Sequence, residues 1–267
     1  MKSDHLLLHG PGLAGYARKS RWPAKLDIAQ GVSGLLLAIF MWVHMLFVSS
    51  ILISKDAMYT VTKAFEGLYL FGEARPWLVS LVVAVVLLLF VLHAALAMRK
   101  FPSGYQQFKT FMAHQRQLQH GDTGLWFVQV VTGFALLFLG SAHLVFMLAN
   151  PDQIGPYQTA DRVWGGMWPI YLVLLFAVEL HGGIGLYRLA VKWNWFQSER
   201  GDGVSRTTLR RVMWGIIVGL ISLGLVTLAV EMDNGYQHRE QAGERYRPVA
   251  GDGFRGHASL PQAKDAG

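Results

Sequence analysis

The sequence predicts an all-helical membrane protein whose chain crosses the bilayer five times. Hydrophobic residues make up 52% of the 267-residue chain and charged residues only 15%, whereas about a quarter of the residues in a soluble domain are charged. Five apolar stretches reach the length of roughly 20 residues that a helix needs to cross the hydrocarbon core. These stretches show no alternation of polar and apolar residues, which argues against the strands of a β-barrel.

The five spans are expected to form one transmembrane domain over residues 26–230. The first contains Asp27 near its start, the fourth contains Glu179 well inside it, and the second, third and fifth are uncharged. Pro76 and Pro169 stand at span starts, where the missing N–H does no harm. The expected spans are residues 26–53, 76–98, 124–149, 167–191 and 212–230.

Basic residues predict the orientation of the chain. Residues 1–25 are polar and basic without the features of a cleaved signal peptide, and are expected to be a cytoplasmic segment. Fifteen Lys and Arg residues flank the spans on that side, against four in the opposite loops. The positive-inside rule then places the polar tail, residues 231–267, on the outer side of the membrane, which is the periplasm for a bacterial inner membrane. We expect the tail to be irregular from Asp233 on. Because the net charge of +7 lies at membrane edges, it indicates lipid rather than a nucleic-acid partner.

Four of the ten histidines lie inside spans, and each of the first four spans carries one: His44, His93, His143 and His181. A single intramembrane histidine usually bonds a neighbouring helix or lines a cavity. Four histidines in four helices are harder to explain in that way. The chain has no cysteine, which excludes disulfides, zinc–thiolate sites, cysteine-ligated iron–sulfur clusters and covalent c-type haem.

The topology sorts these histidines by depth. At 1.5 Å per residue, His44 and His143 both lie near the outer ends of their helices, while His93 and His181 lie in the cytoplasmic half. Two histidines at equal depth on different helices can bind one flat haem from both sides, which fills both axial positions and leaves electron transfer as the task. The pattern therefore predicts two b-type haems enclosed by the five helices. A haem-free proton-coupled transporter or channel is the alternative of another class.

Small and polar residues beside these positions suit haem binding but have ordinary explanations too. Glycines could make room for a wide ring or simply allow close helix packing; they are Gly31, Gly34, Gly133, Gly140, Gly182 and Gly183. Gln30, Trp126 and Lys192 are candidates for binding the propionates of the inner haem, and Arg162 for those of the outer haem. Lipid-headgroup anchoring would account for the same polar residues.

Two carboxylates are candidate proton carriers. Glu179 lies deep in the fourth span, where an ionised acid is expensive, and a proton relay is the favoured interpretation over a neutral structural acid. It precedes His181 by two residues, so the two side chains should point in different directions. If the haems exchange electrons with a quinol, a base at the outer mouth must take its protons. Glu66 in the outer loop suits that task, with Glu73 as a competitor and a solvated loop acid as the plain alternative.

Over roughly residues 18–200 the chain resembles the dihaem cytochrome b subunits of the menaquinol:fumarate reductases, within the succinate:quinone oxidoreductase superfamily. The long stretch around Glu179 and His181 is the most specific part. The residues that carry the resemblance are 21–27, 44, 45, 47–49, 93, 97–102, 120–123, 132–134, 168, 169, 171–182 and 185–193.

This resemblance implies that the four histidines ligate two b haems and that menaquinol is oxidised near the outer haem. It also implies that Glu66 accepts the quinol protons and that Glu179 moves protons across the membrane. The partners would be an iron–sulfur subunit and a flavoprotein with covalent FAD on the cytoplasmic face, in a dimer of heterotrimers. The chain would supply the quinone site alone. A succinate dehydrogenase that reduces menaquinone is the alternative within the family, and a hydrogenase or formate dehydrogenase cytochrome b fits the fourth span poorly.

Overall fold

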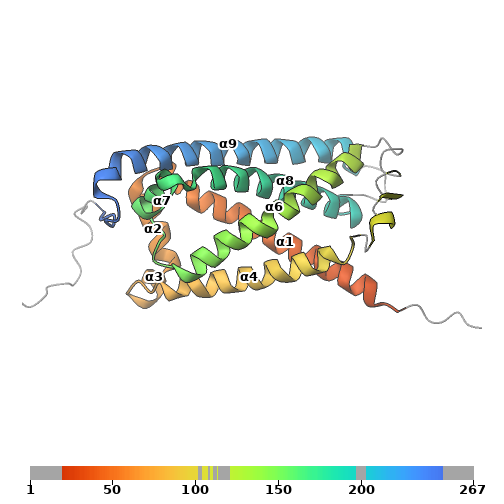
Figure 1. Ribbon diagram of the computed structural model, residues 1–267, viewed down its shortest axis with the longest axis horizontal. Coiled ribbons are helices and arrows are strands. Elements are labelled where there is room, and N and C mark those ends of the chain that lie inside the picture. Colours follow the sequence, from red (N-terminus) through yellow and green to blue (C-terminus); the bar gives the residue numbers. More distant parts are fainter. Residues whose placement is uncertain are drawn as a thin grey trace, which may run out of the picture.

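Five long helices run side by side along the length of the molecule (Figure 1). The computed structural model describes residues 20–101, 104–107, 109, 110, 113, 121–196 and 203–248, and every regular element within them is a helix. The five long helices are α1 (Trp22–Val48), α4 (Trp77–Met98), α6 (Gly121–Ala149), α8 (Trp168–Lys192) and α9 (Arg206–His238). The prediction of an all-helical protein with five membrane spans is confirmed.

Helix α8 is central to the bundle, because it packs against α6, α9 and α1. A buried apolar cluster joins α6, α8 and α9; its members are Leu125, Ile184, Tyr187, Met213 and Ile217. Two glycines let α8 and α9 approach closely. The side chain of Ile217 occupies the space beside Gly183, and the side chain of Leu175 occupies the space beside Gly224. This is the small-residue packing expected between helices in a bilayer, where apolar burial alone does not drive association.

The outward faces of the helices are apolar. On α4, for example, Leu81, Val85 and Leu88 are exposed. Such contiguous apolar surface is rare on a soluble monomer and is what a lipid-facing helix presents. The chain is therefore a multi-pass membrane protein.

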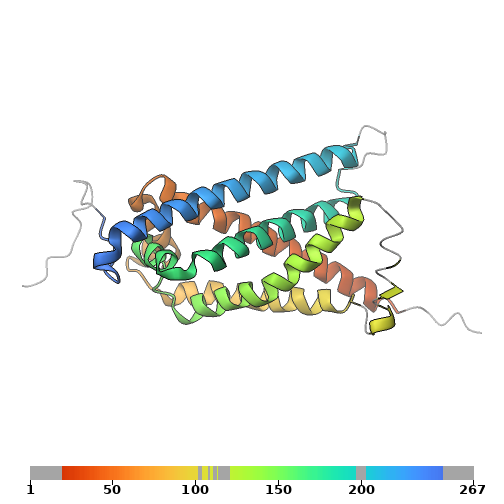
Figure 2. The same ribbon diagram turned by 45° about the horizontal axis from the view of Figure 1, so that its top comes forward.

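Short helices cover one end of the bundle, which we call the capped end (Figures 1 and 2). It contains η1 (Ser49–Leu52), α2 (Lys55–Phe65), α3 (Leu68–Phe71), α7 (Pro156–Arg162), η2 (Val163–Met167) and η3 (Arg239–Gln241). Helix α2 begins at a Ser54 cap, whose hydroxyl accepts a hydrogen bond from the N–H of Ala57 at 2.9 Å. We call the other end, where α1 and α9 begin, the open end.

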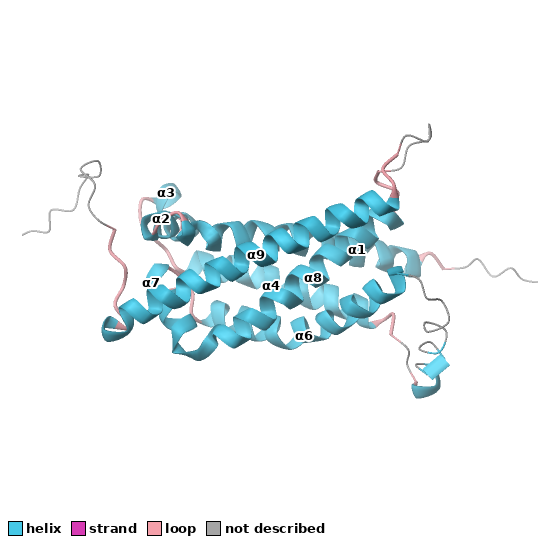
Figure 3. Cartoon of the chain, turned by 90° about the horizontal axis from the view of Figure 1, so that it is seen from above, coloured by secondary structure: helices cyan, strands magenta, loops and turns pink. Residues whose placement is uncertain are grey.

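The end of α9 differs from the sequence prediction. Residues 233–238 were expected to be irregular, but α9 continues to His238 and packs on α7 (Figure 3). The reason is a close tertiary contact: Gly235 lies directly against the backbone of Ala160 and the Cβ of Trp164, where a larger side chain would not fit.

Three residues of the tail contact aspartates at the capped end. The contacts join Gly243 N to Asp161 (2.9 Å), Arg245 to Asp152 (2.7 Å) and the Tyr246 hydroxyl to Asp56 (2.7 Å). Burial and the hydrogen bond to Asp56 raise the pKa of Tyr246 to about 12, so its hydroxyl remains a donor at neutral pH. The expected N-terminal and C-terminal segments lie largely outside the described residues, at 1–19 and 249–267.

Candidate functional site

A large cavity extends from the open end of the bundle to the capped end. Its volume is about 1110 Å³, above the roughly 300–1,000 Å³ of ordinary ligand pockets. Asp27 and Lys100 line its open end, Arg162 and Glu231 line its capped end, and apolar side chains make up most of the wall between them. The bundle therefore encloses room for more than one ligand.

The four intramembrane histidines lie on the wall of this cavity in two pairs. His44 of α1 and His143 of α6 have ring centroids 6.3 Å apart, toward the capped end. His93 of α4 and His181 of α8 have ring centroids 6.4 Å apart, toward the open end. Each pair joins two different helices, so the cavity has one histidine couple in each half.

Protein groups orient the rings of the pair toward the open end. The Nδ1 atom of His181 lies 2.9 Å from the carbonyl oxygen of Gln129, to which only an N–H can donate. The Nδ1 of His93 lies 3.1 Å from the Ser33 hydroxyl, which itself donates to the carbonyl of Gln30. Both contacts place the ring proton on Nδ1 and leave Nε2 available, as outer contacts do for metal-ligating histidines.

Two glycines make room for these imidazoles. A Cβ at Gly34 would lie 2.8 Å from Cε1 of His93, and a Cβ at Gly133 would lie 2.9 Å from Cε1 of His181. Other glycines named from the sequence serve helix packing instead, since Gly183 lies against Ile217 and Gly31 against Trp193. Small residues therefore seat the histidine rings as well as bringing helices together.

The donor set fits a haem better than a bare metal ion. Among the described residues there is no group of three or more His, Asp or Glu side chains that could hold a metal, so a metal between two histidines must bring its other ligands with it. Metal–imidazole bonds of about 2.0–2.1 Å on both sides separate the two ring centres by about 6 Å, close to the 6.3 and 6.4 Å observed. The apolar wall suits a porphyrin, and haem ligation stays a prediction.

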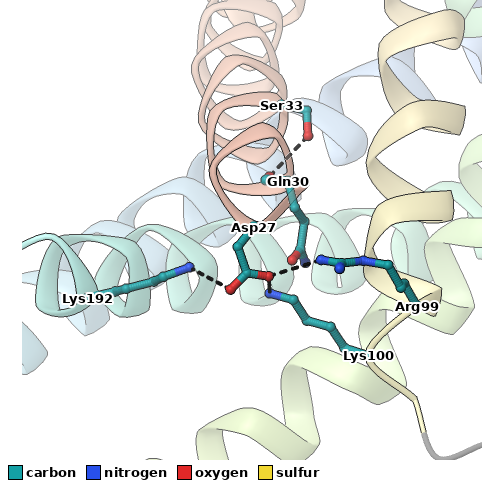
Figure 4. A network of polar contacts seen from close by, with 6 residues as sticks. All are labelled: Asp27, Gln30, Ser33, Arg99, Lys100 and Lys192. Atoms are coloured by element: carbon teal, nitrogen blue, oxygen red, sulfur yellow. Dashed lines mark hydrogen bonds and ion pairs between the residues drawn. The ribbon is translucent and has the colours of Figure 1, made fainter. Parts of the chain in front are cut away.

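An ion-pair network gathers three cations at the open end of the cavity (Figure 4). The carboxylate of Asp27 on α1 lies 3.2 Å from Arg99, 3.0 Å from Lys100 and 3.4 Å from Lys192. These cations come from the ends of α4 and α8, so the network ties three helices together. The sequence does not by itself predict this network; the place of Asp27 one turn inside a helix, near several basic span ends, was the available signal.

All four residues named as propionate candidates line the cavity. Gln30, Trp126 and Lys192 lie toward the open end and Arg162 toward the capped end. The guanidinium of Arg162 donates to the Tyr171 hydroxyl at 2.8 Å through Nε and to a backbone carbonyl at 2.7 Å through Nη1. Polar groups are thus available at both ends for an anionic part of a ligand.

Glu66 is buried rather than solvated. It caps the end of α2, is 1% exposed, and pairs with Lys63 at 2.6 Å. Its neighbours Thr62 and Phe65 line the cavity, whereas Glu66 itself lies behind them. Its competitor Glu73 is exposed and paired with Arg75. Burial beside the cavity wall distinguishes Glu66 from the other loop acid.

Glu179 is fully buried, and its two carboxylate oxygens have no hydrogen-bond partner within the described residues. It does not line the cavity, although its neighbours Val178 and His181 do. Leu175 and Gly183, one turn before and one turn after it, both contact α9. Glu179 therefore lies on the face of α8 that packs against α9, away from the histidine rings.

A third buried acid, Glu231 on α9, was missed in the sequence analysis. It is 2% exposed, lines the cavity toward the capped end, and has no hydrogen-bond partner for either oxygen within the described part of the chain. The fifth span expected from the sequence ends at residue 230, which places Glu231 in the polar tail. Its spacing of four residues from Thr227 was the signal that could have placed it on the same buried face.

Comparison with known proteins gives consistent matches. Residues 106–230 match the family described as succinate dehydrogenase/fumarate reductase transmembrane subunit. A fumarate reductase cytochrome b subunit of Helicobacter pylori (strain 26695) is 47% identical over 241 residues, 90% of this chain and 92% of that protein. A fumarate reductase cytochrome b subunit of Wolinella succinogenes is 46% identical over 243 residues, 90% of this chain and 94% of that protein.

Proposed function

Because this chain belongs to the fumarate reductase cytochrome b subunits, we propose that it binds two b haems, oxidises menaquinol and passes the electrons to soluble subunits that reduce fumarate to succinate. The observation that supports this most directly is the presence of two histidine couples in one continuous cavity. The chain is the membrane anchor of an oxidoreductase complex. In this proposal it contributes only the quinone site and the electron path.

The chain's own residues hold and orient the haems. His44 with His143 would hold one haem, and His93 with His181 would hold the other. A haem bound by two histidines would supply one-electron transfer rather than substrate binding at iron. The propionates meet Gln30, Trp126 and Lys192 at one end and Arg162 at the other, as these polar groups line the cavity there.

The excess of basic residues at the open end favours placing it in the cytoplasm of a bacterial cell, with the capped end at the periplasm. The N-terminus is then cytoplasmic and the C-terminus periplasmic. An iron–sulfur subunit and a flavoprotein with FAD dock on the open end, close to the His93–His181 couple. Two such heterotrimers form a dimer in this proposal.

Glu66 accepts a proton from menaquinol at the capped end. Oxidation of the quinol releases two electrons and two protons, and the electrons would leave through the haems held by the histidines. Glu66 lies behind Thr62 and Phe65 of the cavity wall, and the ammonium group of Lys63 keeps a compensating charge beside it. A buried carboxylate with such a partner can take a proton from the quinol and then release it to water at the capped end, which restores the ion pair.

Replacement of Glu66 by glutamine should lower menaquinol-driven fumarate reduction on the order of 100-fold, because the amide cannot accept the proton. Fumarate reduction driven by a water-soluble viologen radical, which delivers electrons to the soluble subunits, should not change. Both rates are measured on the purified complex. Glu73→Gln, which alters the exposed acid of the same loop, is the control. A Glu66→Gln complex with wild-type menaquinol turnover would refute the assignment.

Glu179 carries protons inward to balance the electrons. Electrons that move from the capped end to the open end would charge the membrane and cost about 2.3 kcal/mol per charge for each 100 mV. A proton that crosses in the same direction cancels this cost. This role is supported by the burial of Glu179 between α8 and α9 and by the lack of a hydrogen-bond partner for its oxygens among the described residues.

The absorption spectrum of the purified chain tests the proposed function. A bis-histidine haem protein shows sharp bands on reduction, and the pyridine haemochrome assay should give two b haems per chain. The native complex should also contain the flavoprotein and iron–sulfur subunits after purification. A colourless preparation would reject the proposal and favour a haem-free transporter.

A further inference from the structure

Helix α9 has a buried polar face at the capped end, which the proposed haem and quinol chemistry does not explain. Four polar residues of α9 lie on one side of the helix, because they follow one another at intervals of four, three and four residues. They are Thr227, Glu231, Asn234 and His238. All four are buried. Polar groups in such positions are costly within a membrane protein and usually mark an ion or proton pathway.

Glu231 connects this face to the cavity. One turn earlier on α9, the Thr227 hydroxyl lies 3.0 Å from the hydroxyl of Ser49, which fixes α9 against η1. Glu231 itself lines the cavity, and no group within the described residues bonds its oxygens. Burial has the largest influence on this acid, and the charges of Arg162 of α7 and Lys55 of α2 act against it. An acid in this position, balanced between these opposing influences, can take a proton from the cavity and release it again.

The other end of the face is a histidine–carboxylate couple. The Nδ1 of His238 lies 2.8 Å from Asp161 of α7, and Nε2 is buried without a partner among the described residues. The ring of Tyr157 stacks on the imidazole at 3.9 Å and holds its plane. With the Nδ1 proton on the carboxylate side, Nε2 is the nitrogen that can receive a proton. Asp161 is partly exposed, so the couple connects the buried face to the aqueous side.

We propose that this face of α9 is a proton outlet that runs from Glu231 through Asn234 to His238 and Asp161. The inference rests on the proposed function. Oxidation of menaquinol releases two electrons, which would leave through the bound haems to the soluble subunits that reduce fumarate, and it releases two hydroxyl protons. Glu66 takes one of these protons and Glu231 takes the other.

The proton on Glu231 leaves in three transfers. Nε2 of His238 receives a proton, the imidazolium gives its Nδ1 proton to Asp161, and the Asp161 carboxyl gives that proton to water. Glu231 and His238 are seven residues apart, a rise of about 10 Å along the helix. That distance is too long for one hydrogen bond, so the first transfer runs through a water molecule that the buried amide of Asn234 can orient. After one proton has passed, Glu231 and Asp161 are back in their first states, while the imidazole of His238 carries its proton on Nε2 and must return it to Nδ1 by a ring flip before the next cycle.

The test follows haem reduction in the purified complex by stopped-flow absorption with a water-soluble naphthoquinol. Glu231→Gln should slow quinol-driven haem reduction roughly tenfold or more. Reduction by dithionite, which releases no quinol protons, should keep the wild-type rate, and the haem content should stay at two. The redox difference infrared spectrum should lose the carbonyl stretch of one protonated carboxyl group. Glu231→Asp, which keeps the acid, should restore most of the rate.

Asp233→Asn is the matched control, since Asp233 lies on the exposed side of the same helix and bonds Gln237; it should behave as wild type. His238→Ala should be slow with quinol and regain speed with imidazole in the buffer. Wild-type kinetics in Glu231→Gln would overturn the proposal, as would an equal slowing with dithionite, which indicates a structural role. A wild-type complex without haem bands would instead refute the proposed function.

Discussion

Replacement of His181 by alanine should leave one b haem per chain instead of two. The imidazole belongs to the histidine couple toward the open end of the cavity, and its partner His93 lies 6.4 Å away, centroid to centroid. Without the imidazole of His181, the haem would lose one of the two protein groups that would hold it. The pyridine haemochrome assay on the purified chain gives the count directly, and the reduced spectrum should keep the bands of the remaining haem.

The other couple should respond independently. His143→Ala removes the haem toward the capped end, and the double variant should be colourless. His238→Gln is the control, because His238 is also a buried histidine but does not line the cavity; it should retain two haems. Retention of both haems in His181→Ala would contradict the ligand assignment.

Replacement of Glu179 by glutamine should abolish menaquinol-driven fumarate reduction while both haems stay bound. The glutamine side chain has the same shape and fits the interface between α8 and α9, but it cannot carry a proton. Since each uncompensated charge costs about 2.3 kcal/mol per 100 mV, electron flow should stop. Turnover with menaquinol in sealed vesicles and the haem spectrum of the same preparation are the two measurements.

The exposed acid Glu73 again provides the control, because Glu73→Gln changes one carboxylate without touching the bundle. Viologen-driven fumarate reduction should be normal in both variants, which shows that the soluble subunits are intact. Unchanged menaquinol turnover in Glu179→Gln would show that Glu179 is a neutral structural acid.

The meeting of the histidines could be predicted from sequence because helix geometry fixes depth. A residue's distance from the span end, multiplied by the rise of the helix, gives its height in the membrane. For His93 and His181 this estimate left a mismatch of several ångströms in straight, untilted helices. The structure brings them as close as the other couple, and Figure 1 shows that the long helices cross obliquely.

Burial of the acids could not be predicted in the same way, because it depends on partners that are distant in sequence. Glu66 follows a polar helix, and its sequence context is equally typical of a solvated residue. In the structure it is buried beside Lys63. Glu231 lies where apolar sequence gives way to polar, but α7 and η1 cover that part of α9. The helical spacing of the buried polar residues on α9 is visible in the sequence, whereas the elements that cover them are not. These residues are Thr227, Glu231, Asn234 and His238.

Helix α8 presents His181 to the cavity and Glu179 to the opposite interface with α9. In the proposed function, electrons and protons therefore travel on opposite sides of one helix, separated by its backbone. The two routes can then evolve separately. Substitution of Glu179 alone would change whether the overall reaction moves net charge across the membrane, and it would leave the residues around the haems unchanged.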